Sequence, residues 1–182
     1  MLARIKMLSS TFCSVVVGTV LMGTMLICTM LVGTGCGSDS RSEAALTDVP
    51  LDDVVARFVF TDSSVPPDDH RSYTVEVQSG RATVEVRDYD RVLASSDVVL
   101  DERAVEALLQ RLDGVPQELL MGECVGSPRY SSRVTDGSDV VPHLASADRC
   151  EPEAEALADV IVEAWEPVLS ELGVSTLVSS TR

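Results

Sequence analysis

Two neighbouring segments in the middle of the chain alternate between apolar and polar residues with a period of two. The first has its apolar residues at positions 73, 75 and 77, and the second has them at positions 82, 84 and 86. Ser79-Gly80 lies between them, and a glycine-containing pair between two alternating runs is typical of a β-hairpin. Because each strand has one apolar face, the sequence predicts an antiparallel sheet with one side packed on a core.

Further strands and a helix are predicted around this hairpin. Residues 57–60 form a short apolar run, and residues 91–100 form the next strand after the turn Asp88-Tyr89-Asp90. Asp101 is a suitable N-cap for a helix that ends near Gly114. The apolar residues of this helix have the spacing i, i+3, i+4 and i+7: Val105, Leu108, Leu109 and Leu112.

A second helix is predicted to begin at Pro152, to carry Trp165 on its apolar stripe and to end or kink at Pro167. Between the two helices, residues 129–135 and 139–141 are interpreted as a second hairpin around Asp136-Gly137. The order of elements predicts an α+β fold, an antiparallel sheet of hairpins with two helices packed on one face.

The N-terminal segment has a different composition from the rest of the chain. Residues 1–10 are basic, with Arg4 and Lys6, and no charged residue occurs from Thr11 to Gly35. A basic head followed by an apolar run is the layout of a secretory signal. The run ends in Gly33-Thr34-Gly35-Cys36, and polar residues follow at once.

These residues resemble the lipobox of bacterial lipoprotein precursors. Thr34 and Gly35 match the small residues at positions −2 and −1, and Cys36 matches the cysteine at +1, whereas Gly33 departs from the usual leucine at −3. The resemblance implies that signal peptidase II cuts before Cys36, that the thiol carries diacylglycerol and that the new amino group is acylated, for example by palmitate. The alternatives are an uncleaved transmembrane anchor, for which the apolar run is long enough, and an ordinary cleaved signal.

The sequence therefore predicts three parts: a signal peptide over residues 1–35, a lipidated cysteine with a flexible tether over 36–50, and one globular domain over 51–182. In each interpretation the basic N-terminus stays in the cytoplasm and the domain lies outside it. Gly37 follows the cysteine directly, where an aspartate retains such lipoproteins in the inner membrane. This favours the outer membrane or the cell surface.

Charge excludes several classes of function. Residues 36–182 hold 12 arginines and 29 acidic residues, a formal charge of 12 − 29 = −17, and Lys6 is the sole lysine of the chain. A Walker A loop, a Schiff-base lysine and a Ser–Lys dyad each need a lysine that the domain lacks. The sequence shows no arginine cluster, so nucleic acid is not expected as a partner.

Two cysteines remain in the domain, Cys124 and Cys150, and outside the cytoplasm such a pair is expected to form a disulfide. No pattern of metal ligands or cofactor motif accompanies them, so neither a metal nor a cofactor is expected. The histidines His70 and His143 are interpreted as loop residues, and no nucleophile elbow supports a Ser-His-Asp triad. The acidic turns, around Asp88 and Asp136, lack the spacing of an EF-hand loop.

Two hypotheses of function follow from these observations. The first is a non-catalytic, lipid-anchored envelope protein that binds a protein or another surface component. The second is a small secreted protease inhibitor or an enzyme of undetected type. The order of strands and helices resembles that of emfourin-like metalloprotease inhibitors in topology only, and no inhibitory motif occurs in the chain.

Overall fold

A computed structural model describes residues 45–181, except for residues 64, 67, 121, 123 and 137–141. The fold is α+β, as the sequence predicts. Two short 3-10 turns, η1 and η2, precede the first strand. The bounds of the elements are η1 Leu46–Asp48, η2 Leu51–Asp53, β1 Val55–Thr61, β2 Ser72–Gln78, β3 Arg81–Asp88, β4 Arg91–Val99, α1 Glu102–Asp113, β5 Leu119–Leu120, β6 Arg129–Thr135, β7 His143–Asp148, α2 Pro152–Glu171 and α3 Val174–Ser180.

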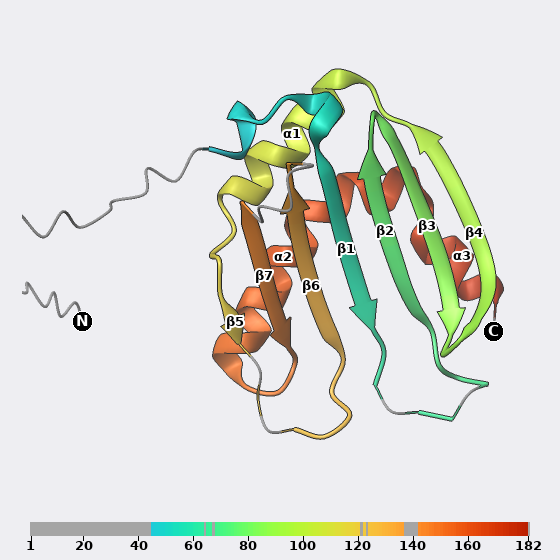
Figure 1. Cartoon of the computed structure of the whole chain (residues 1–182). Coiled ribbons are helices and arrows are strands. Elements are labelled where there is room, and N and C mark those ends of the chain that lie inside the picture. Colours follow the sequence, from blue (N-terminus) through green and yellow to red (C-terminus); the bar gives the residue numbers. More distant parts are fainter. Residues whose placement is uncertain are drawn as a thin grey trace, which may run out of the picture. The chain divides into compact units, whose positions relative to one another are not determined.

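The strands form one sheet in the order β4-β3-β2-β1-β6-β7-β5 (Figure 1). All neighbours are antiparallel except β5 and β7, which are parallel. The β2–β3 hairpin is confirmed: its turn consists of Ser79 and Gly80, both with positive φ, 49° and 71°. Two positive φ values are the signature of the type I′ turn, whose twist matches that of the flanking strands.

The helices all cover one face of the sheet, and in Figure 1 they lie behind it. Helix α1 begins as predicted, because Asp101 Oδ1 accepts a 2.8 Å hydrogen bond from the backbone N–H of Ala104. Its four predicted apolar residues are buried. Helix α2 begins at Pro152 but does not end at Pro167; it continues to Glu171. Buried side chains on both sides of Pro167, Trp165 and Val168, hold the helix on the core through this position.

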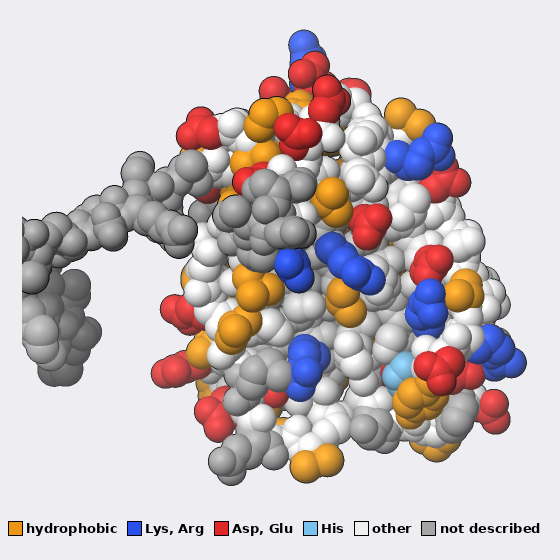
Figure 2. All heavy atoms as spheres, viewed as in Figure 1, with side chains coloured by type: hydrophobic (Ala, Val, Ile, Leu, Met, Phe, Trp, Pro, Cys, Tyr) orange, Lys and Arg blue, Asp and Glu red, His pale blue; other side chains and the backbone are white. Residues whose placement is uncertain are grey.

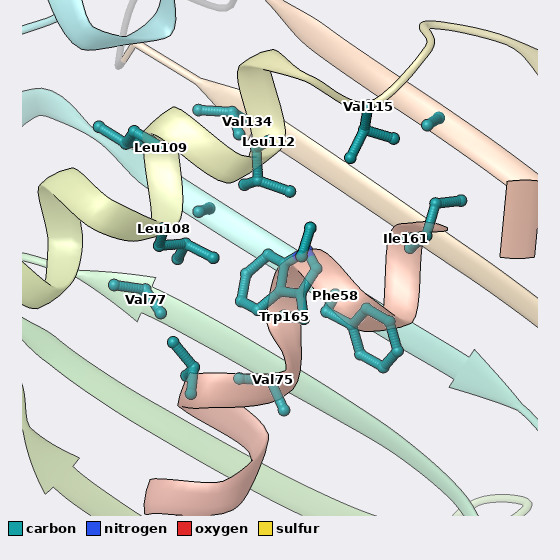
Figure 3. Close-up of a cluster of buried hydrophobic side chains, with 14 of the residues drawn as sticks. Phe58, Val75, Val77, Leu108, Leu109, Leu112, Val115, Val134, Ile161 and Trp165 are labelled. Carbon is teal, nitrogen blue, oxygen red and sulfur yellow. The ribbon is translucent and has the colours of Figure 1, made fainter. Parts of the chain in front are cut away.

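The core lies between the sheet and the helices, with Trp165 and Phe58 at its centre (Figure 3). The two rings are 5.7 Å apart, and Trp165 donates a 2.9 Å hydrogen bond from Nε1 to Ser132 Oγ. All buried core residues of the described part lie between Leu46 and Val174. The described core thus begins at Leu46, before the first strand.

Three features differ from the sequence prediction. The partner of β6 is β7, with Val134 opposite His143, whereas the predicted strand at 139–141 lies outside the described residues. A third helix, α3, follows Gly173, whose positive φ of 64° turns the chain after α2. Residues 45–50, predicted as the end of the tether, belong to the folded part: Leu46 is buried, and its N–H donates to Asp113 Oδ1 at 3.2 Å.

Candidate binding face

The face of the sheet opposite the helices is uncovered by any described element (Figure 1). Strand alternation decides which residues lie on it. In β1, Ala56 and Phe58 are buried against the helices, so Arg57 and Val59 point to the open face. The same alternation on the neighbouring strands leaves polar side chains on this face.

Five arginines lie on the open face: Arg57, Arg81, Arg87, Arg129 and Arg133. Arg81 pairs with Asp97, and Arg87 pairs with Glu85 at 2.6 Å. The other three have no carboxylate within 4.0 Å among the residues that the structure describes. Figure 2 shows basic side chains in the middle of this face. The fold thus brings onto one face arginines that lie far apart in the sequence.

Arg57 and Arg133 lie directly opposite each other on the adjacent antiparallel strands β1 and β6. Like charges in this arrangement repel and destabilise a sheet. On the other side of Arg57, the opposite residue is Glu76, but the two side chains do not form an ion pair. The fold thus places Arg57 and Arg133 at directly opposite positions of the open face, and neither forms an ion pair with a described residue.

Beside Arg57 the open face contains a hollow of about 490 Å³ over β2, β3 and β4. Its lining is almost entirely polar, with both signs of charge and several hydroxyl groups. The lining residues are Arg57, Thr74, Glu76, Thr83, Val84, Glu85, Arg87, Ser95, Ser96 and Asp97. A surface of this composition is suited to a polar ligand rather than to an apolar one.

The helix layer has the opposite charge. Helix α2 carries six carboxylates and no basic residue: Glu153, Glu155, Asp159, Glu163, Glu166 and Glu171. Because the chain has a net charge of −15, the arginines of the open face are an exception to its overall composition. The sheet and the helices therefore present two electrostatically different surfaces.

His70 lies in a loop as predicted, but it is buried, and it contacts a serine. Its Nδ1 accepts a hydrogen bond from the backbone N–H of Tyr89 at 3.2 Å, so Nε2 of the neutral ring carries the proton. Nε2 is 3.1 Å from Ser72 Oγ, to which it donates. A catalytic base must instead accept the serine proton, so this arrangement holds the Tyr89 turn in place rather than activating Ser72.

His143 is the first residue of β7 and is 1% exposed, so the prediction of a loop position was wrong. Its Nε2 has no hydrogen-bond partner among the described residues. Burial lowers the pKa of His143 below its usual value, and the negative charge of Asp113 opposes this shift in part. The neutral imidazole is therefore the form that the fold favours.

The predicted disulfide joins Cys124 and Cys150, with Cα atoms 5.6 Å apart. Gly122 packs directly against it: a side chain there would place Cβ 2.5 Å from the Cβ of Cys150. The N–H of Gly122 donates to Asp148 Oδ2 at 3.0 Å. Asp148 and Asp88 are both buried.

Several of the expected sites lie outside the residues that the structure describes. Cys36 and residues 1–35 lie outside the described part, as do Gly137 and Asp139 of the acidic turn. Asp88 is the last residue of β3 and pairs with Arg91 at 2.9 Å. Within residues 45–181, so far as they are described, no three His, Cys, Asp or Glu side chains meet in a way that would hold a metal ion. Nor has any helix of that part the length and apolar character needed to cross a membrane.

Sequence reasoning missed the arginines of the open face because they are far apart in the chain. Arg57 and Arg133 are separated by the whole of β2, β3, β4 and α1. The sequence does indicate that Arg57 and Arg133 lie on the polar sides of their strands, but it does not indicate that the two strands are neighbours. Comparisons of the chain with protein-family models, with curated proteins and with solved structures find no match.

Proposed function

We propose that the protein is a lipid-anchored extracytoplasmic binding protein that holds an anionic partner on the open face of its sheet, without catalysis. The observation that carries this proposal is the cross-strand pair Arg57 and Arg133, which lacks a carboxylate partner among the described residues. The domain has many more carboxylates than arginines, yet none of the described carboxylates forms an ion pair with Arg57 or Arg133. The unpaired arginines lower the stability of the sheet, but they offer a binding site to an anion.

The chemistry of the pair indicates the kind of group that it binds. A guanidinium presents planar N–H donors that match carboxylate and phosphate oxygens. An anion between Arg57 and Arg133 would remove their mutual repulsion and accept hydrogen bonds from both. The hydroxyl groups of the adjoining hollow, among them Thr74 and Thr83, then face the remainder of a polar ligand.

The lipobox at Cys36 supports the anchored location. The net charge of the domain is negative, so an anionic membrane surface would repel it rather than hold it. Attachment therefore depends on the acyl chains, and two or three chains give lasting binding where a single one is marginal.

Titration of the domain with small anions tests the binding site. Inorganic phosphate and a short polyglutamate peptide serve as separate probes, and NMR follows the side-chain Nε–H signals of the arginines. We expect saturable shifts at Arg57 and Arg133, lost in Arg57→Gln and Arg133→Gln and retained in the control Arg103→Gln on α1. The stronger probe identifies the anionic group. Equal shifts at all exposed arginines would contradict the proposal.

Metabolic labelling tests the anchor. Cells that express the full chain are given a fatty acid that carries an alkyne, and the purified protein is examined for the label. We expect labelling of the wild type and none of Cys36→Ser. A label that survives this substitution would exclude Cys36 as the acylated residue.

Substrate panels test the absence of catalysis. The domain is assayed against esters, peptides, glycosides and phosphoesters, beside His70→Ala and His143→Ala. We expect no turnover above that of a blank. Turnover that copurifies with the wild type and disappears in either variant would overturn the non-catalytic part of the proposal.

A further inference from the structure

A groove runs along the solvent side of the helix layer, on the face of the molecule opposite the arginines. Three adjoining hollows of about 400, 170 and 410 Å³ form it. The first and second share Arg111 and Ala164, and the second and third share Val160. The three are therefore one continuous feature, which we call the interhelical groove.

The floor of the interhelical groove is apolar and includes four alanines. On α1 it consists of Ala104, Ala107 and Leu108, and on α2 it follows Ala156, Val160, Ala164 and Pro167. These α2 positions span about 16 Å at 1.5 Å per residue, or three turns of a helix. Small side chains allow the backbone of a partner to approach closely, so one more helix can pack on this floor.

The rim of the interhelical groove is acidic. Five acidic residues line the three hollows against one basic residue, Arg111; the five are Asp101, Glu118, Glu153, Glu163 and Glu171. None of the five forms an ion pair with a described residue. Complementary charge on an occupant would be positive.

The surroundings of the groove also select the conformation of the occupant. Over the first two hollows the walls are mainly α1 and α2, whose interior backbone groups are already hydrogen-bonded. The third hollow adds the edge strand β5, which has only two residues, Leu119–Leu120, and offers an extended peptide little to pair with. A helix satisfies its own backbone, places an apolar stripe on the floor and leaves its polar sides at the rim. A second copy of this chain is disfavoured, because its α2 presents the same carboxylates.

We propose that the interhelical groove docks a cationic amphipathic helix of a partner protein. The apolar stripe of that helix lies between α1 and α2, and its Lys or Arg side chains flank the stripe and face the carboxylates of the rim. This interaction is independent of the anion site, because the two surfaces lie on opposite layers of the domain.

The test uses the domain with its tether, residues 36–182 with Cys36→Ser, because the described core is complete within this part. The probe is a 15-residue helical peptide with leucine on one stripe and lysine elsewhere. Two further peptides separate the contributions: one replaces lysine by glutamate, and the other replaces leucine by serine. Fluorescence anisotropy measures affinity, and NMR of alanine methyl groups locates the site.

We expect saturable binding of the Leu/Lys peptide, with methyl shifts confined to alanines of the groove such as Ala104, Ala107 and Ala156. Ala107→Trp should weaken binding at least tenfold, whereas Gln110→Trp, on α1 outside the groove, should not. Glu163→Gln should weaken binding more than Glu166→Gln, which removes the same charge outside the groove. Equal binding of the serine peptide, indifference to Ala107→Trp, or no binding would overturn the proposal.

Discussion

The indole N–H of Trp165 donates to the hydroxyl of Ser132 across a 2.9 Å hydrogen bond, and both residues are completely buried. This bond joins α2 to β6 in the centre of the core. Ser132→Ala leaves a buried N–H without an acceptor, which costs about 1–3 kcal/mol of the free energy of unfolding. Urea unfolding followed by the fluorescence of this single tryptophan measures the loss. Ser131→Ala, on the opposite face of the same strand, serves as control and should change the stability far less.

Reduction of the Cys124–Cys150 disulfide should destabilise the domain. The bridge closes a loop with a sequence separation of 26 residues, which corresponds to roughly 3 kcal/mol in the chain-entropy model. Cys124→Ser should lower the melting temperature by several degrees, and the intact mass of the wild type should be two hydrogens below that of the reduced protein. Two freely alkylated thiols in the folded protein would contradict this assignment.

Gly122→Ala should perturb the same region without removing a sulfur atom. The added methyl group meets the Cβ and Sγ of Cys150, so the loop has to move and its hydrogen bond to Asp148 is strained or lost. We expect a lower melting temperature and faster reduction of the disulfide by dithiothreitol. An unchanged rate of reduction would show that the loop accommodates the added methyl group without weakening the disulfide.

Acid should destabilise the domain in part through His143. Its pKa is lowered in the folded state, so the unfolded chain binds a proton first as pH falls below about 6.5. The contribution of neutral His143 is therefore fully present above that pH and is lost as pH falls toward the lowered pKa. Comparison of urea unfolding at pH 7.5 and 5.0 should show a larger loss in the wild type than in His143→Leu. Equal losses would contradict the buried neutral ring.

Tyr73 should ionise later than a free tyrosine. Burial, with a smaller contribution from Tyr130, raises the pKa of Tyr73 to about 12. The difference in absorbance at 295 nm between wild type and Tyr73→Phe should therefore rise near pH 12 rather than near pH 10. Because the folded state keeps the proton longer, the contribution of Tyr73 to stability is lost as pH rises from about 10 through 12. A difference signal near pH 10 would place the hydroxyl in water.

The arginine pair should cost stability in the absence of an anion. Arg133→Gln removes the cross-strand repulsion with Arg57 and should stabilise the domain by about 0.2–1 kcal/mol at low salt. The gain should shrink as salt screens the charges. Arg103→Gln, on α1, is the control. A destabilised Arg133→Gln would mean that the guanidinium contributes packing that outweighs the repulsion.

Local patterns in the sequence predict most of the fold. The alternation in β2 and β3, the Ser79-Gly80 turn and the Asp101 cap each act over a few residues, and the structure confirms them. Pro167 does not end α2: a proline lacks one hydrogen bond and crowds the preceding turn, but the buried side chains around it oppose a break. The inward-facing residues 145 and 147 of β7 are alanines, which give a weak apolar pattern. The strand was therefore predicted at 139–141, where Val140 and Val141 are more strongly apolar.

The candidate site was less predictable than the fold. The disulfide was predicted from the number of cysteines and the expected compartment, and its formation in the structure confirms the pairing. The Arg57–Arg133 pair depends on the register between two strands 68 or more residues apart, 129 − 61 = 68 at their nearest ends. No local pattern encodes such a pairing. The burial of His70 and His143 likewise depends on which distant elements pack over them.

The central position of β1 has a consequence for the order in which the domain assembles as the chain is made. Strands β1 to β4 form a meander of consecutive antiparallel neighbours, which a chain emerging N-terminus first can pair as soon as residue 99 is available. The other edge of β1 pairs only with β6, which ends at Thr135. Until then this half-sheet exposes an unpaired edge and the uncovered side chain of Phe58, the combination that invites aggregation. Pairing of β6 then closes the edge of β1, and α2 later covers Phe58 with Trp165, so the strands made first depend on the last third of the chain for protection.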